Sequence, residues 1–271
     1  MFFDLHIHTN HSDGLFSPEE VVDLAAAKNL DGIAITDHDT ITGIKIAMEH
    51  SKRYNNFIVI PGIEFGCVYD DEEVHILGYF IDYEDSELIK LTDTLKKSRL
   101  NRGVEMIKKI NELGMKLSLE DVIEFSGEEY IGRPHIARAM VKKGYISNVS
   151  EGFTKFLDRG KPAYADRYKI SISETIALIK NIGGISVLAH PGLLKNKEII
   201  QHCIAMGING LECIHSKHNQ EDTNCLIQIA KRNNLIITGG SDFHGDSKDG
   251  SSLLGNYFVN INDTPQFKER I

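Results

Sequence analysis

Several residue types that mark extracellular and membrane proteins are scarce in this sequence. Its 271 residues contain no tryptophan, six prolines and four cysteines, and the cysteines form no CxxC pair. Cysteines this sparse do not build a disulfide framework, so we expect reduced thiols in a cytoplasmic protein. The sequence also has no apolar run of about 18 residues, and its first residues turn polar too early for a signal peptide. We therefore expect no membrane span.

Positive charge is also in short supply. The chain has 30 lysines and arginines against 39 aspartates and glutamates, which gives a net charge of −9. Binding along duplex DNA requires a basic surface, so duplex DNA is not an expected partner. A small phosphorylated substrate is compatible with this charge, because bound metal cations would reverse the field around them.

Short β-branched segments that end in polar residues alternate with helical patterns. The segments are Phe2–Leu5, Gly32–Thr36, Phe57–Ile63, Ile185–Ala189, Gly210–Ile214 and Leu235–Thr238. After the first of them, Ser17 and Pro18 followed by two glutamates are typical of a helix N-terminus. Alternation of this kind favours an α/β fold with a parallel sheet and crossover helices.

The middle of the chain departs from this alternation. From about residue 85 to residue 167 strand signals nearly disappear, and apolar residues recur at helical spacing. These apolar residues, Leu88, Leu91, Leu95, Val104, Ile107 and Ile110, predict one long helix or two in series. We therefore expect a helical insertion at residues 85–167, within a barrel formed by residues 1–84 and 168–271.

Histidines and carboxylates gather near the ends of the predicted strands, and one lies within a further predicted strand, residues 73–80. The nine residues are His6, His8, Asp13, His38, Glu64, His75, His190, Asp242 and His244. A single histidine at a strand end is usually solvated, but nine such side chains have no simple structural explanation. One tetrahedral metal ion takes about four imidazole or carboxylate ligands. The sequence therefore predicts at least two ions, with Glu64 placed to bridge them.

These residues lie in five ordered motifs that resemble the PHP (polymerase and histidinol phosphatase) superfamily. The motifs are Asp4-Leu5-His6-Ile7-His8-Thr9 with Ser12-Asp13-Gly14, Thr36-Asp37-His38-Asp39, Pro61-Gly62-Ile63-Glu64 with His75-Ile76-Leu77-Gly78-Tyr79, Leu188-Ala189-His190-Pro191 and Gly240-Ser241-Asp242-Phe243-His244-Gly245. Ile131-Gly132-Arg133-Pro134-His135 and Arg159-Gly160-Lys161-Pro162-Ala163-Tyr164 resemble a stand-alone branch with a helical insertion. The resemblance covers nearly the whole chain.

The resemblance implies a distorted seven-stranded (β/α) barrel with a site for two or three divalent metal ions. Carried over residue by residue, one ion would bind His6, His8, Glu64 and Asp242, a second Asp13, His38 and His244, and a third Glu64, His75 and His190. Some PHP phosphatases have histidine where this chain has Asp13, so their metal preference does not carry over. The hard carboxylates favour manganese, with iron or zinc as alternatives.

The resemblance to this branch implies a metal-dependent phosphoric ester hydrolase. Its expected substrates are 3′,5′-nucleoside bisphosphates, AMP-like nucleotides or the 5′ ends of short oligoribonucleotides, attacked by a metal-bound hydroxide. The expected substrate contacts are Arg133, His135, Lys161, His215 and His218. Arg99 and Arg102 are further candidates, although a solvated helix face is the simpler interpretation of both.

Three other functions are compatible with parts of the pattern. Histidinol-phosphate hydrolysis is the main alternative among phosphoesterases, and metal-dependent amidohydrolases also begin with an HxH motif. Ligands at the second and third strands and the terminal Asp-x-His favour the phosphoesterase. A non-catalytic metal-binding or nucleic-acid-binding module is the third alternative, although all nine ligand positions are filled.

Overall fold

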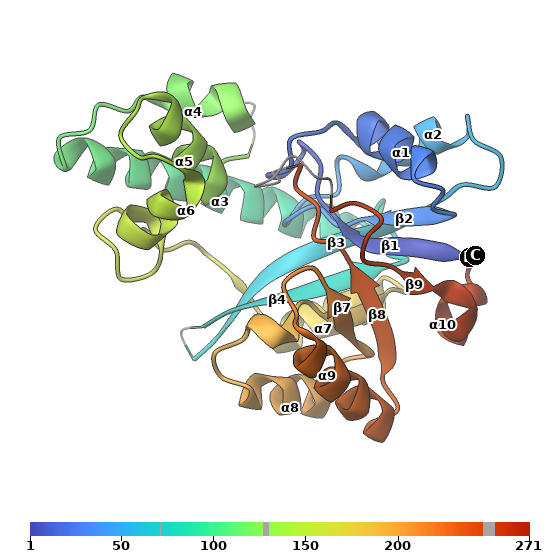
Figure 1. The fold of residues 1–271 in the computed structure, drawn as a ribbon. Helices are drawn as coiled ribbons and strands as arrows, with labels where there is room; N and C mark the ends of the chain where they lie inside the picture. The colour runs from blue at the N-terminus through green and yellow to red at the C-terminus, as the bar shows by residue number, and fades with distance from the viewer. Residues whose placement is uncertain (71, 127–129, 246–252) are drawn as a thin grey trace.

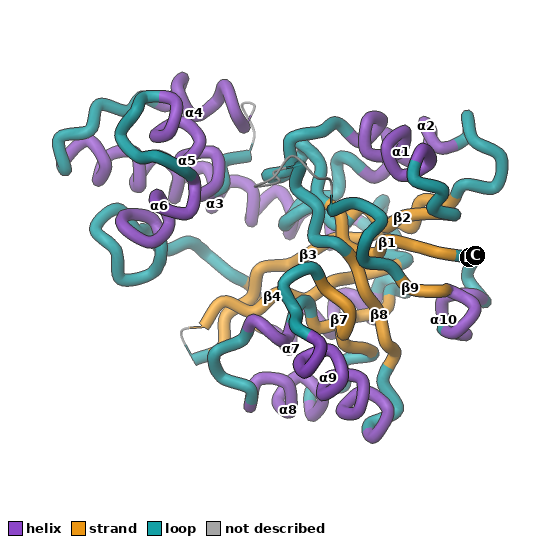
Figure 2. Tube along the Cα trace, viewed as in Figure 1, coloured by secondary structure: helices purple, strands orange, loops and turns teal. Residues whose placement is uncertain are grey.

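The computed structural model describes residues 1–70, 72–126, 130–245 and 253–271. In this part of the chain a strongly curved sheet carries helices on its outside, and a second group of helices lies to one side of it (Figure 1). Figure 2, coloured by secondary structure, shows the strands gathered in the centre of the larger part. None of the described helices is long and apolar enough to cross a membrane.

Seven strands form the curved sheet. They are β1 (Phe2–Ile7), β2 (Gly32–Ile35), β3 (Ile58–Tyr69), β4 (Glu72–Tyr79), β6 (Ile185–Leu188), β7 (Gly210–His215) and β8 (Ile236–Gly240), in the order β8-β7-β6-β4-β3-β2-β1. A bridge between Ile7 and Phe243, just after β8, nearly closes the ring. The two-residue strands β5 (Ile170–Ser171) and β9 (Val259–Asn260) pair with β3 and β1 and bring the described strands to nine. The predicted α/β barrel is confirmed.

The prediction of a parallel sheet was wrong for β4, which runs antiparallel to both of its neighbours. Because its direction is reversed, the first half of β4 lies at the end of the barrel where the parallel strands finish. His75 therefore faces the same rim, opposite Gly66 of β3.

The prediction that Glu64 ends its strand was also wrong. The strand continues to Tyr69 because its second half pairs with β4 as a hairpin, after the parallel pairing with β2 has stopped at Pro61.

Helices cover the outside of the barrel. They are α1 (Pro18–Ala27), α2 (Ile44–Ser51), α7 (Ile172–Asn181), α8 (Glu198–Ala205) and α9 (Gln220–Arg232), with a short α10 (Pro265–Lys268) near the C-terminus. Strand side chains alternate between two buried groups: Ile33 packs with the helices, whereas Ala34 belongs to a group with Phe3, Tyr79 and Phe267. The buried group that contains Ala34 consists of strand and C-terminal side chains, and it fills the space that the ring of strands encloses.

The second group of helices has a hydrophobic core of its own. It contains α3 (Ser86–Glu112), α4 (Leu119–Ser126), α5 (Arg133–Lys142), α6 (Val149–Gly152) and a π-helical turn, η1 (Phe153–Leu157). The predicted middle helices form one long helix, α3, whose Leu88 and Leu95 pack on the barrel while Met106 and Ile110 pack with the other helices. From these two cores we propose that residues 85–167 are an insertion that α3 anchors to the barrel.

Candidate metal centre

The rim of the barrel brings the nine predicted ligands together. Ligand atoms of neighbouring members lie within 4.8 Å of one another in overlapping groups: His8, Asp13, His38 and His244; His6, His8 and Glu64; and His38, Glu64 and His75. Asp242 Oδ1 lies 3.4 Å from His8 Nε2, and His190 Nε2 lies 3.1 Å from Glu64 Oε1. Each of these groups could hold a metal ion.

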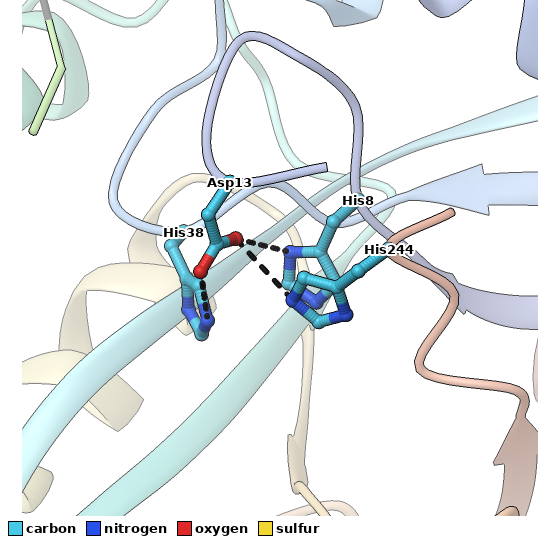
Figure 3. Close-up of side chains that lie close together, drawn as sticks. All are labelled: His8, Asp13, His38 and His244. Carbon is cyan, nitrogen blue, oxygen red and sulfur yellow. Dashed lines mark ion pairs between the residues drawn. The ribbon is translucent and has the colours of Figure 1, made fainter. Parts of the chain in front are cut away.

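Asp13 and three histidines show the spacing that suits an ion. In Figure 3 the Asp13 carboxylate points toward all three rings. Its oxygens lie 3.9 Å from His8 Nδ1, 3.9 Å from His38 Nε2 and 3.3 Å from His244 Nε2. These distances exceed those of direct hydrogen bonds, whereas two ligands each about 2.1 Å from a tetrahedral ion lie roughly 3.4 Å apart.

Glu64 lies at the centre of the cluster and is 1% exposed. Its Oε2 atom lies 3.4 Å from His6 Nε2, 3.3 Å from His8 Nε2 and 2.9 Å from His38 Nδ1. Its Oε1 atom lies 2.9 Å from His75 Nδ1 and 3.1 Å from His190 Nε2. A carboxylate whose two oxygens face different sets of histidines has the geometry of a bridging ligand.

Several buried atoms of the cluster have no hydrogen-bond partner in the part of the chain that the structure describes. They are His6 Nε2, both ring nitrogens of His8, Asp13 Oδ1, His38 Nδ1, Glu64 Oε2 and His215 Nε2. Leaving a buried polar atom without a partner costs about 1–3 kcal/mol, so such atoms are rare in proteins unless a ligand satisfies them. Because they gather on one cluster of nitrogen and carboxylate oxygen donors, they fit divalent metal ions.

The carboxylates of the cluster are held in their charged form. Burial alone would raise the pKa of Glu64, but the adjacent histidines, first His38 and then His75, hold it well below its usual range. The pKa values of Asp13 and Asp242 are lowered against burial for the same reason. The neighbouring carboxylates in turn overcome burial at His8 and raise its pKa to about 10. Because histidine binds a metal in its neutral form, a bound cation would replace the proton on His8 and take its place beside the carboxylates.

The backbone around the cluster is strained at two of the predicted ligands. His190 has a φ of 32° and Asp242 a φ of 54°, a region that residues other than glycine seldom adopt. Strain of this kind persists only where the surrounding structure imposes it, and it concentrates at functional sites. At Gly240 a Cβ atom would lie 2.4 Å from the His6 backbone nitrogen, so only glycine lets the end of β8 approach β1 this closely.

Sequence reasoning missed Glu212, a fully buried carboxylate on β7. Its Oε1 atom lies 2.9 Å from His6 Nδ1, and its Oε2 atom accepts a hydrogen bond from the His190 backbone at 2.8 Å. It also forms a fourth possible metal group with His6 and His215. The signal was present in the sequence, because Glu212 is the single charged residue in an otherwise apolar strand segment. Glu212 orients two of the candidate ligands.

The five predicted substrate contacts lie in different surroundings. Arg133, the first residue of α5, lines a cavity of about 240 Å³ above the cluster, and His215 is buried against Asp242. Both ring nitrogens of His218 face the backbone, at Cys213 O and Gly192 N. His135 is buried, and burial lowers its pKa to about 4. Lys161 is exposed and does not line this cavity.

The solvated face expected for Arg99 and Arg102 was wrong. Each is 6% exposed, and both line the cavity above the cluster. Arg99 donates to Asp39 Oδ2 through Nε at 2.7 Å. Arg102 donates to the Ala165 carbonyl at 3.0 Å, and within the described residues it has no ion pair. The two arginines lie three residues apart on α3, and their shared face turns toward the metal cluster instead of toward solvent.

Similar proteins give the family. A model of the PHP domain matches residues 4–204. The 3′,5′-nucleoside bisphosphate phosphatase of Chromobacterium violaceum is 30% identical over 92% of this chain and 90% of its own. The 5′-3′ exoribonuclease Rnm of Salmonella typhimurium is 30% identical over 90% of this chain and 85% of its own.

A solved structure agrees with these matches. A predicted metal-dependent phosphoesterase from Bifidobacterium adolescentis superposes with a TM-score of 0.90 at 32% identity, over 99% of this chain and 96% of its own. An amidohydrolase from Chromobacterium violaceum, with sulfate bound and no metal, gives a TM-score of 0.87 at 28% identity, over 99% and 96% of the two chains. The predicted resemblance and the predicted class of reaction, metal-dependent hydrolysis of phosphate esters, are confirmed. The chain belongs to the PHP domain family.

Proposed function

We propose that this chain hydrolyses a phosphate ester of a small nucleotide, or of the 5′ end of a short oligoribonucleotide, with two or three divalent metal ions. The observation that carries the proposal is the set of buried ligand atoms without partners at the floor of a cavity lined by arginines. Metal ions would bind the unpartnered histidine and carboxylate atoms of the cluster, and the negative charge of a phosphorylated substrate would pair with the arginines.

We propose the strand-end cluster as the metal site. One ion would take His6, His8, Glu64 and Asp242, a second Asp13, His38 and His244, and a third Glu64, His75 and His190. The mixture of carboxylates and imidazoles favours manganese, with iron or zinc as alternatives. When bound, such ions supply a nucleophile at neutral pH and neutralise charge on the phosphate oxygens. Glu212 would hold the His6 ring in place through its contact with His6 Nδ1.

We propose that Arg102 and Arg133 bind a phosphate group of the substrate that does not react. Arg102 is buried, donates to the Ala165 carbonyl and has no acidic partner among the described residues, and a buried cation without a counter-charge is costly. Arg133 contacts Glu73 at 2.9 Å but keeps 21% of its side chain exposed toward the cavity. A planar guanidinium binds phosphate through two parallel hydrogen bonds, which fixes the orientation of the substrate above the cluster.

Two relatives support a phosphorylated nucleotide as substrate, and a third supports a site for a tetrahedral anion. The bisphosphate phosphatase and the exoribonuclease are named for substrates that carry more than one phosphate. The structurally similar amidohydrolase from Chromobacterium violaceum has sulfate bound, a tetrahedral anion of the same shape as phosphate. For this chain we accordingly propose a substrate with one phosphate at the cluster and a second on the arginines.

We also propose a cytoplasmic location. Cys67, Cys203 and Cys213 are buried and unpaired. Burial raises the pKa of each of these thiols to about 12, so they stay protonated and react slowly. Unpaired thiols suit a reducing compartment.

The test is phosphate or nucleotide release by the manganese-loaded protein from adenosine 3′,5′-bisphosphate, AMP, histidinol phosphate and a 5′-phosphorylated oligoribonucleotide. Metal-free protein is the control. We expect metal-dependent turnover of the bisphosphate or the oligonucleotide. Turnover of histidinol phosphate alone would keep the metal site and replace the substrate, and hydrolysis of amides with inert phosphate esters would point to an amidohydrolase. Binding without any turnover, with the metal content verified, would favour a non-catalytic module.

A further inference from the structure

A second cavity adjoins the cavity above the metal cluster. It measures about 580 Å³, and Glu73, Arg133 and Leu193 line both cavities. Pockets for small ligands measure roughly 300–1,000 Å³, so the second cavity is large enough for a nucleotide. The first cavity, at about 240 Å³, lies below this range. A substrate longer than one nucleotide would extend from the first cavity into the second.

Four cations and one aromatic ring line the second cavity: Arg133, Arg159, Lys169, Lys195 and Tyr164. Four carboxylates line it as well, but three of them already have partners. Glu73 lies 2.9 Å from Arg133 and 3.6 Å from Lys169, and Asp158 lies 3.6 Å from Arg133. Both oxygens of Glu72 accept backbone hydrogen bonds, from the Lys195 and Asn196 nitrogens.

The lysines of this cavity are less well satisfied than its carboxylates. The side chain of Lys169 is 7% exposed and reaches one carboxylate, Glu73, at 3.6 Å. Lys195 is exposed, and its ammonium group has no ion pair among the residues that the structure describes. Tyr164 contributes its ring to the cavity wall, with the Arg102 guanidinium 5.7 Å from the ring centre. Cations beside an aromatic ring are typical of single-stranded nucleic-acid sites.

Strand geometry shows how far the second cavity reaches. His75 belongs to the metal cluster, and Glu72, three residues earlier on β4, lines the second cavity. At roughly 3.3 Å per residue the two Cα atoms lie about 10 Å apart along the strand. The paired strands β3 and β4 run toward the lower left of the barrel in Figure 1, and the second cavity lies outward from the cluster along β4.

We propose that the second cavity binds the nucleotide that follows the scissile phosphate in a single-stranded RNA. Lys169 and Lys195 would contact its phosphate, and Tyr164 would stack on its base. This inference rests on the proposed function and narrows it, because it makes oligoribonucleotides better substrates than nucleoside bisphosphates. The metal cluster and the arginines would bind both kinds of substrate, whereas the second cavity would bind only the oligoribonucleotide.

The experiment compares kcat/KM for a 5′-phosphorylated pentaribonucleotide with kcat/KM for adenosine 3′,5′-bisphosphate, using manganese-loaded protein. We expect the wild type to prefer the pentamer. Tyr164→Ala should reduce this preference by about 5- to 150-fold, the effect of losing one stacked base, and Tyr164→Phe should restore it. Lys195→Glu should reduce the preference and lower the slope of log(kcat/KM) for the pentamer against log(salt) by about 0.7.

The matched control is Lys180→Glu, which makes the same charge change at an exposed lysine of α7 that lines neither cavity. An unchanged preference in both Tyr164→Ala and Lys195→Glu would overturn the second cavity as an RNA site, while turnover of the bisphosphate would leave the proposed function intact. If no ester is hydrolysed, the proposed function fails. In that case the affinity for a fluorescent phosphorothioate pentamer tests whether the second cavity binds RNA. Equal affinity of the wild type and Lys195→Glu would overturn the inference.

Discussion

The cavity above the cluster has two walls of different origin and opposite charge. One wall comes from the ends of barrel strands and carries the histidines and carboxylates of the cluster, including Asp13 and Glu64. The other wall comes from α3 and α5 and carries Arg99, Arg102 and Arg133. Among the described residues, the first wall has buried ligand atoms without hydrogen-bond partners, and the second has three guanidinium groups, of which that of Arg102 forms no ion pair.

The opposite charges of the two walls explain how one cavity can bind cations and anions at the same time. Metal ions and arginines would repel one another on the same wall, but on facing walls both attract a phosphate placed between them. Asp39 connects the two walls, because it follows His38 in the chain and pairs with Arg99 of α3. It also pairs with Arg167, which lies in the segment before β5. The barrel wall would therefore govern metal binding and the chemical step, and the helical wall would govern the choice of substrate.

The largest expected effect is on the barrel wall. His38→Ala and Asp242→Ala each remove a proposed ligand, so turnover should fall by about 10²- to 10³-fold, the scale for losing a principal source of charge stabilisation. Metal content measured by mass spectrometry should fall as well, while circular dichroism shows a folded protein. Full activity in either variant would remove the proposed site.

The helical wall should respond differently. Arg102→Ala removes one charge-assisted contact worth about 1.5–3 kcal/mol, so kcat/KM for the bisphosphate should fall by about 10- to 150-fold. Metal content should stay at the wild-type value, because Arg102 contacts no proposed ligand. Arg232→Ala, at an exposed arginine of α9, is the matched control. A loss of metal in Arg102→Ala would break the proposed division of roles between the walls.

The two walls also differ in how much the sequence could predict. The residues that meet on the barrel wall were predicted almost completely, because strand ends of a barrel meet at one rim and clustered histidines and carboxylates have few other uses there. Their role as metal ligands stays a prediction. The helical wall was not, because Arg99 and Arg102 look like ordinary surface residues of a long helix. Their burial depends on how α3 crosses the rim, and that crossing is a tertiary contact that local periodicity does not encode.

Three details of the barrel wall could not be predicted from the sequence, because each depends on tertiary contacts. The reversal of β4 and the extension of β3 follow from pairing between strands. The sequence therefore predicted that His75 and Glu64 belong to the cluster, but not how their strands lie in the sheet. Glu212 was missed because its role lies in contacts with His6 and the His190 backbone rather than in a motif. Residue types were predictable, whereas the contacts that position them were not.

Glu212 gives a prediction of intermediate size within the barrel wall. Glu212→Gln keeps the volume but replaces the charged acceptor beside His6 Nδ1. Loss of a residue that orients a metal ligand typically costs 10- to 100-fold in metal affinity or activity, so we expect an effect smaller than that of His38→Ala. Titration with manganese, followed by activity, measures it. An effect as large as that of His38→Ala would make Glu212 a ligand, in the group it forms with His6 and His215.

Substitution of Asp39 is expected to change folding stability, and it tests the connection between the two walls. Burial would raise the pKa of Asp39, but Arg99 and Arg167 outweigh burial and hold it below its usual value. Because the folded-state pKa lies below the unfolded value of about 3.9, the stabilisation is complete above about pH 4 and is lost as pH falls through the folded-state pKa. Asp39→Asn should therefore lower the free energy of unfolding by about 3 kcal/mol at pH 7, because two buried guanidinium groups lose their partner. Urea unfolding of metal-free wild type and variant should show a constant difference from pH 7 to pH 5 and a shrinking one below pH 4. A difference that disappears already above pH 5 would contradict the ion pairs as the connection between the metal cluster and the helical wall.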